Sequence, residues 1–90
     1  MNIGEAIIEL RRGYRVAREG WNGKGIFLAL QTPDEHSKMT NEYIYINTTG
    51  LDSDNEKAPR CLVPWLASQT DLLGNDWVAL TNPDGNDNTE

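Results

Sequence analysis

The sequence predicts a single α+β domain in which one N-terminal helix packs on a largely antiparallel β-sheet of four to five strands. Three observations lead to this fold class. Residues 1–13 carry apolar side chains at helical spacing, and the later segments alternate in polarity or are rich in β-branched and aromatic residues. Turn-forming glycine, asparagine and proline residues separate these segments. A length of 90 residues corresponds to one domain.

The first element is predicted to be a helix that begins after Asn2. Asn2 can cap the helix, and Glu5 stands three residues later, as in a capping box. Gly13 stands where a helix often ends with a left-handed residue. One face of this helix should be buried, because apolar residues recur at the helical spacing: Ile3, Ala6, Ile7 and Leu10.

The rest of the domain is predicted to be mainly strands, at residues 14–18, 26–31, 43–48 and 76–80, with a short extended segment at 61–63. Residues 26–31 are apolar on both faces, which indicates a central strand. Ser68 and Asp71 fit the cap of a short helical turn at 68–73, and Trp77 is expected in the core. We expect residues 1–81 to form one ligand-binding domain and residues 82–90, which lack apolar side chains, to form a disordered polar tail.

Charge is distributed unevenly along the chain. The net charge is -6, with about +2 in residues 1–30 and about -8 in the remainder. An acidic surface repels duplex nucleic acid, whereas a small anionic ligand could bind near the basic N-terminal third. The sequence shows no signal peptide and no apolar run of membrane-spanning length, so a cytoplasmic location without membrane attachment is expected. Cys61 has no partner for an internal disulfide and is expected to be a small apolar strand residue.

No set of residues indicates catalysis. The chain has no HExxH, Walker A or EF-hand pattern, and its one histidine and one cysteine do not make a metal site. Asp71 and Asp76 could form a carboxylate pair, but a helix cap and a surface charge explain them more simply. We therefore expect a protein that is not an enzyme and that needs no cofactor.

Two tryptophans near the ends of expected strands could serve a binding role. Trp21 lies in the stretch GWNGKG and Trp65 in PWLASQTD, each among residues that offer hydrogen bonds. Such rings can stack on a base, and glycine amides such as those of Gly23 and Gly25 can approach a phosphate closely. The competing interpretation is that both rings only cover a small core. The residues themselves leave both interpretations open and do not name a ligand.

Three segments, in the same order along the chain, resemble a known family: NIGEAIIELRRGYRVAREGWNGKGIFL, YIYI and LVPWLASQTDLLGNDW. The chain is similar to the Thoeris anti-defence sponge family of small bacteriophage proteins. That resemblance implies immune evasion: binding and sequestration of a cyclic ADP-ribose isomer (glycocyclic ADP-ribose), the nucleotide signal of the bacterial Thoeris defence, without cleavage. It also implies a homotetramer with pockets between subunits, action in the cytoplasm of the infected host, and, in some members, binding of cyclic oligonucleotides.

The resemblance also implies roles for individual residues. The Trp21 ring would stack on a base or ribose while Lys24 offsets phosphate charge. The remaining expected ligand-binding residues are Asn22, Gly23 and Gly25 in the first loop, Asn47 at the end of the third strand, and a second wall, supplied by the same or a neighbouring subunit, made of Trp65, Ser68, Gln69, Thr70 and Asp71.

Two other classes of function are open at this stage. An acidic inhibitor of a bacterial defence effector, of the anti-CRISPR type, would use the acidic stretch 52–56 and would bind a protein. An enzyme that hydrolyses the signal would release a linear product. The sequence does not distinguish between linkage isomers of the cyclic nucleotide, and it does not separate a dimer from a tetramer.

Overall fold

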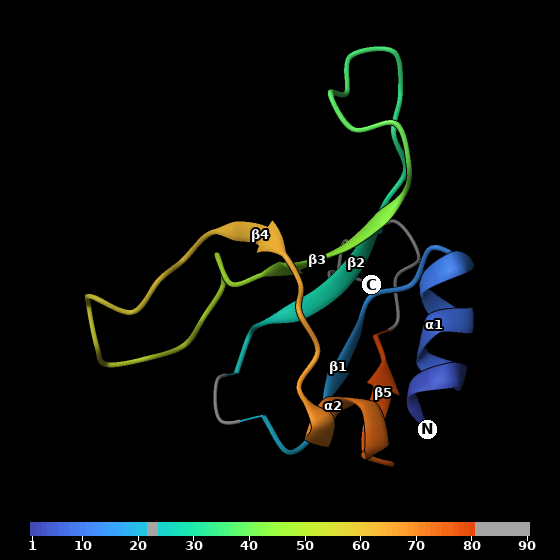
Figure 1. Ribbon diagram of the computed structural model, residues 1–90. Coiled ribbons are helices and arrows are strands. Elements are labelled where there is room, and N and C mark those ends of the chain that lie inside the picture. The colour runs from blue at the N-terminus through green and yellow to red at the C-terminus, as the bar shows by residue number, and fades with distance from the viewer. Residues whose placement is uncertain (22–23, 81–90) are drawn as a thin grey trace.

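The computed structural model describes residues 1–21 and 24–80, in which one helix is followed by four strands, a short second helix and a last strand (Figure 1). Their bounds in chain order are α1 Ile3–Arg11, β1 Val16–Arg18, β2 Phe27–Gln31, β3 Tyr43–Asn47, β4 Leu62–Pro64, α2 Gln69–Leu73 and β5 Trp77–Ala79. This confirms the predicted α+β class, with an N-terminal helix, a five-stranded sheet and a short second helix.

The sheet is antiparallel throughout, with the strand order β4-β3-β2-β1-β5. The prediction that residues 26–31 form a central strand is confirmed, because β2 is the middle strand. The last strand, β5, returns to pair with β1, so that Val16 lies between Leu28 on one side and Ala79 on the other. The N-terminal residue Met1 continues the pairing beyond β5, since its amino group donates to the carbonyl oxygen of Trp77 at 2.8 Å.

Helix α1 forms where the capping signals predicted it. The Asn2 side chain accepts from the Glu5 amide, and the Glu5 carboxylate accepts from the Asn2 amide. Gly13 follows the helix with a φ of 94°, in the left-handed region that glycine adopts easily. Helix α1 packs against β1, β2 and β5, and α2 touches α1, so both helices lie on the same side of the sheet (Figure 1).

The core lies between the helices and this face of the sheet. Ala6 and Leu10 of α1 pack on Val16, Leu28 and Trp77, and these five side chains are at most 2% exposed. The core position of Trp77 is therefore confirmed. Its ring meets the edges of two partly buried tryptophans, with ring centroids 5.5 Å from Trp21 and 5.9 Å from Trp65.

The opposite face of the sheet has no helix over it within the described residues. Since side chains alternate along a strand, the register places Ala17, Phe27, Tyr45, Asn47 and Val78 on this face. All five are partly buried. We call this surface the open face.

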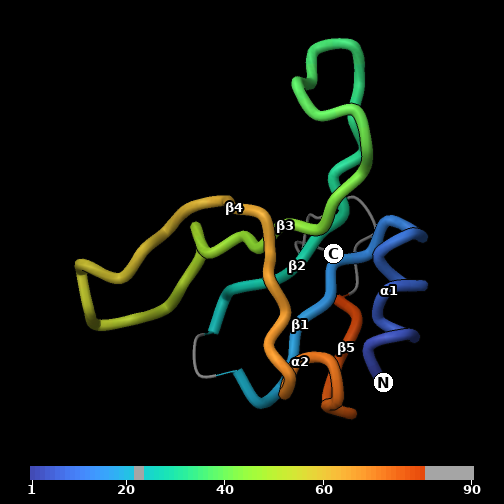
Figure 2. Tube along the Cα trace, in the orientation of Figure 1, coloured from blue at the N-terminus to red at the C-terminus, as the bar shows by residue number. Residues whose placement is uncertain are grey.

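Two long loops extend from opposite ends of the sheet (Figure 2). One, residues 32–42, joins β2 to β3, and the other, residues 48–61, joins β3 to β4. Arg60 organises the second loop, because its guanidinium donates to the carbonyl oxygens of Leu51, Ser53 and Ala58 at 3.2–3.4 Å.

Some predicted boundaries differ from the structure. The first strand begins at Val16 and not at residue 14, and Cys61 precedes β4 with an exposed side chain. Cys61 instead closes the base of the loop through its backbone, which bonds with Thr48. Residue 81 and the predicted tail 82–90 lie outside the described residues. None of the described helices is both long and apolar enough to cross a membrane.

Candidate functional site

A groove with a volume of about 590 Å³ lies along the open face near the ends of β1, β2 and β3. The segment that enters β2 and the start of the loop after β3 form its sides. Its lining residues come from the sheet, the segment that enters β2 and the loop after β3: Arg15, Ala17, Arg18, Trp21, Lys24, Gly25, Ile26, Phe27, Asn47, Thr49, Gly50 and Leu80. A volume of this size falls in the range of about 300–1,000 Å³ that is typical of small-molecule sites.

The groove is positive although the protein is acidic. Three of its lining residues are basic, Arg15, Arg18 and Lys24, and none of those described is acidic. Two carboxylates outside the groove neutralise Arg18, so the charge available to a ligand comes from Arg15 and Lys24. Opposite charges attract more strongly in a partly enclosed site than in water, so this groove favours an anion.

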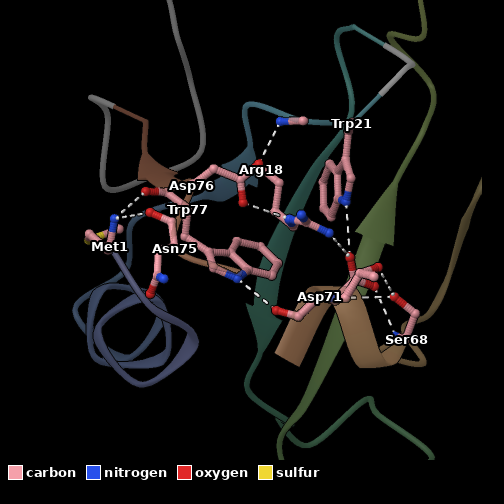
Figure 3. A network of polar contacts seen from close by, with 10 residues as sticks. Met1, Arg18, Trp21, Ser68, Asp71, Asn75, Asp76 and Trp77 are labelled. Carbon is pink, nitrogen blue, oxygen red and sulfur yellow. Dashed lines mark hydrogen bonds and ion pairs between the residues drawn. The ribbon is translucent and has the colours of Figure 1, made fainter. Parts of the chain in front are cut away.

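Trp21 lies at the junction of the groove and the core. Its indole nitrogen donates to Oδ1 of Asp71 at 3.2 Å, and its ring packs edge to face on Trp77 (Figure 3). Trp21 is partly buried and also lines the groove. It therefore acts as part of the core cover and is available to a ligand as well, so the two interpretations of this residue are compatible.

A network of polar contacts holds Trp21 in this orientation (Figure 3). Arg18 bridges two carboxylates, with Nη1 2.9 Å from Asp71 and Nε 2.8 Å from Asp76. Asp76 also accepts from the amide of Gly20 at 2.7 Å. These contacts link β1, helix α2 and the residue before β5 next to Trp21.

The network shifts the pKa values of its members. Burial alone would raise the pKa of Asp71, but hydrogen bonds from the Ser68 amide, the Arg18 guanidinium and the Trp21 indole outweigh it and lower the pKa to about 2. The hydrogen bond from Arg18 lowers the pKa of Asp76, and bonds to Asp76 and Asp71 raise the pKa of Arg18. All three groups are therefore charged at neutral pH.

At Gly25, the segment that enters β2 meets the loop after β3, beside the groove. Its φ of 85° lies in the left-handed region, and a Cβ at this position would overlap the carbonyl oxygen of Gly50. The neighbouring Lys24 carbonyl accepts from the Asp52 amide at 2.9 Å, which forms an isolated antiparallel bridge. Glycine is needed here for the close approach of two backbones, and that approach gives the groove its second side. The Lys24 side chain is exposed at the groove.

Asn47 ends β3 and presents its side chain to the groove from the open face. Its Oδ1 accepts from the amide and the hydroxyl of Thr49, at 2.9 Å and 2.7 Å. The amide NH₂ of Asn47 is therefore the part of the side chain that can donate to a ligand.

The structure brings together only some of the residues that the sequence suggested. Trp21, Lys24, Gly25 and Asn47 line the groove. The expected second wall, Trp65, Ser68, Gln69, Thr70 and Asp71, does not, and Asn22 and Gly23 lie outside the described residues.

Structural roles account for part of that second wall. Ser68 and Asp71 form the capping box of α2. Trp65 packs on Trp77 and lines a separate cleft of about 440 Å³ between α1 and β3, where Arg11 and Glu42 form an ion pair. In one copy of the chain, Asp71 of this wall bonds to the Trp21 indole, but none of the five residues lines the groove.

Sequence reasoning missed Arg15, Thr49 and Gly50, which all line the groove. For Arg15 a signal existed, because the alternation of β1 places it with Ala17 on the face opposite the core residue Val16. For Thr49 and Gly50 no local signal existed, because their position depends on how a long loop folds back on Gly25.

The arrangement can hold an anionic ring-containing molecule by stacking, charge and hydrogen bonding. The described residues include no group of three or more histidine, cysteine, aspartate or glutamate side chains placed to hold a metal ion.

Comparison with known proteins gives two agreeing results. Residues 1–80 match the family model described as Tad2-like, the Thoeris anti-defense 2-like domain. A curated protein of Bacillus phage SP01 named Thoeris anti-defense 2 is 34% identical over 85 residues, which span 86% of this chain and 91% of that protein. The match includes the segments that carry Trp21, Asn47 and Trp65.

Proposed function

Since this chain belongs to the Tad2-like family of Thoeris anti-defense proteins, we propose that it sequesters the signal of that defence. Membership of the family supports a phage anti-defence role. The ligand is a cyclic ADP-ribose isomer, glycocyclic ADP-ribose, and the protein holds it without cleaving it. A sequestered signal cannot activate the effector of the defence. The proposed place of action is the cytoplasm of the infected bacterium.

The single observation that carries this proposal is the positive groove on an acidic protein. It combines the aromatic ring of Trp21 with the cations Arg15 and Lys24, and the described lining includes no carboxylate. An adenine or ribose face needs a ring to stack on, and a diphosphate needs positive charge and donors. The groove provides both within one space of about 590 Å³.

Sequestration also fits the chemistry of the site. A sponge needs affinity and slow release and no nucleophile or general base. The test is to incubate the purified protein with signal made by an active Thoeris enzyme, remove the free signal by filtration, denature the protein and identify the released compound by mass spectrometry. Intact cyclic signal supports sequestration, a linear product would make the protein an enzyme, and signal left in the filtrate would refute both.

Trp21→Ala tests the groove directly. We expect the affinity for the signal to fall at least about 10-fold, which corresponds to about 1.4 kcal/mol, because one stacking contact contributes roughly 1–3 kcal/mol. Isothermal titration calorimetry measures the affinity, and a thermal melt shows whether the variant is folded. Unchanged affinity in a folded variant would mean that Trp21 only covers the core.

Trp65→Ala is the matched comparison, since Trp65 packs on Trp77 in the same edge-to-face manner but lies outside the groove. We propose that a second copy of the chain supplies Trp65, Ser68 and their neighbours to the pocket, as the family resemblance implies. A loss of affinity in both variants supports this pocket between subunits. A loss in Trp21→Ala alone would refute it and leave the groove of a single copy as the site.

A homotetramer is part of the same proposal. The open face offers partly buried apolar side chains, among them Phe27, Tyr45 and Val78, that no described helix covers. Such a face is suited to pack against another copy. Analytical ultracentrifugation gives the oligomeric state, and a monomer at micromolar concentration would refute this part. We propose no contact with membranes or duplex nucleic acid, and binding of cyclic oligonucleotides can be tested by the same titration.

The acidic-inhibitor alternative makes a different prediction for the loop after β3. Asp52, Asp54 and Glu56 are exposed there. A sponge should be almost indifferent to their replacement by serine, because the bridge to Lys24 uses the backbone of Asp52 and not its carboxylate. An inhibitor that mimics nucleic acid should lose its activity in the same variant.

A further inference from the structure

Arg15 is the most buried of the basic side chains that line the groove. It is 5% exposed and lies on the open face, directly before β1. Its guanidinium carbon is 4.5 Å from the centroid of the Phe27 ring, so the cation rests on an aromatic face. Phe27 is itself a groove residue, which places this pair at the sheet side of the groove.

Among the arginines, Arg15 is the one with no hydrogen bond or ion pair to the side chains and carbonyls of the described residues. Its Nε is buried and has no hydrogen-bond partner among the described residues, and none of their carboxylates forms an ion pair with it. The other arginines are satisfied: Arg18 by two carboxylates, Arg11 and Arg12 by one glutamate each, and Arg60 by backbone carbonyls. Buried charges are normally paired, because an isolated cation loses its hydration without compensation.

An anion in the groove would supply the negative partner that Arg15 lacks among the described residues. The guanidinium is planar and presents its N–H groups as a fork, which matches two oxygens of one phosphate. The contact with the Phe27 ring restrains the guanidinium before a ligand binds, which reduces the freedom lost on binding. Lys24 is exposed on the same groove and can reach a second phosphate as a point charge.

We propose that Arg15, held on the Phe27 ring, is the anion-binding residue of the groove and takes a phosphate of a nucleoside diphosphate-type ligand, with Lys24 beside it. The inference rests on the proposed function for the identity of the ligand, but the anion site itself can be tested without the signal. It assigns stacking to Trp21 and charge recognition to Arg15 within one groove.

The direct test is nuclear magnetic resonance of the arginine side-chain Nε–Hε groups in the full-length protein, titrated with inorganic pyrophosphate. The Arg15 signal should shift and saturate, whereas that of Arg12, which is outside the groove, should stay in place. No saturable shift at Arg15, or an equal shift at both arginines, would overturn the proposal.

Two variants extend this test to binding. Arg15→Gln should weaken the binding of pyrophosphate and of ADP at least about 10-fold, and Arg15→Lys should weaken it less, because the charge is kept and the fork is lost. Arg12→Gln is the matched control and should leave both affinities unchanged. A thermal melt identifies any variant that does not fold, and the titration of the wild-type protein needs no variant. Unchanged affinity in folded Arg15→Gln would overturn the proposal.

The outcomes separate this inference from the proposed function. If the wild-type protein binds the cyclic signal and folded Arg15→Gln binds it equally well, the sponge stands and the role of Arg15 is refuted. If pyrophosphate shifts Arg15 but the cyclic signal does not bind, the anion site stands and the sponge is refuted.

Discussion

Replacement of Asp71 by asparagine should lower the free energy of unfolding and make it less sensitive to acid. Asp71 is 8% exposed and accepts from the Ser68 amide, the Arg18 guanidinium and the Trp21 indole. An asparagine keeps one acceptor oxygen but turns an NH₂ group towards donors, and it leaves the charge of Arg18 with one carboxylate fewer.

The magnitude follows from the pKa of Asp71, which falls from 3.8 to about 2 on folding. This lowering of the pKa by nearly 2, at about 1.36 kcal/mol for each pKa unit, means that the ionised carboxylate contributes roughly 2 kcal/mol to the stability of the fold. Because the folded pKa is lower than the unfolded one, this contribution is complete above about pH 4 and is lost as the pH falls towards about 2.

The assay is urea unfolding followed by tryptophan fluorescence, at neutral pH, at about pH 4 and at about pH 2. The wild-type protein should be more stable than Asp71→Asn by roughly 2 kcal/mol at neutral pH, and the difference should shrink as the pH approaches about 2. The control is Glu56→Gln, because Glu56 is exposed in the loop after β3 and should change stability by less than about 0.5 kcal/mol. A difference between wild type and Asp71→Asn that does not depend on pH would refute the reasoning.

Two further variants test the packing around the groove. Gly25→Ala should lower stability by at least about 1 kcal/mol and weaken ligand binding, because it combines a positive φ with overlap on the Gly50 carbonyl. Gly50→Ala, whose Cβ would meet the Gly25 carbonyl at 3.2 Å, should lower stability less. Equal losses of stability for the two variants in urea unfolding would contradict this account. Trp77→Ala should cost about 3–5 kcal/mol, because Trp77 is 1% exposed and its indole bonds to the Asp71 carbonyl at 2.9 Å; a loss below about 1 kcal/mol in the same assay would show that the three tryptophans do not form a common core.

The local elements could be predicted because their signals are local. The capping box of Asn2 and Glu5, the left-handed Gly13, and the cap of Ser68 and Asp71 each act within a few residues. The central position of β2 was also indicated locally, because its residues are apolar on both faces of the strand. The strand boundaries were less accurate, since strand ends depend on the neighbouring strand.

The candidate site was predictable only in part. Trp21, Lys24 and Gly25 are close in sequence, so a single glycine-rich stretch indicated all three. Asn47 lies beside them because the register of β3 with β2 pairs it with Phe27. The sequence motif suggested that the residues around Trp65 join them, but in the fold these residues do not line the groove, and Trp65 lines the cleft between α1 and β3.

The sequence by itself determined the fold class, the N-terminal helix with its caps, the family and the stretch GWNGKG that carries Trp21, because composition, periodicity and motifs are properties of the chain. Only the tertiary structure decided that Gly25 meets Gly50, that Arg18 is neutralised while Arg15 is not, and that the groove is positive on an acidic protein. The physical reason is that pairing, burial and local charge depend on distances between residues far apart in the chain, and these distances exist only after folding.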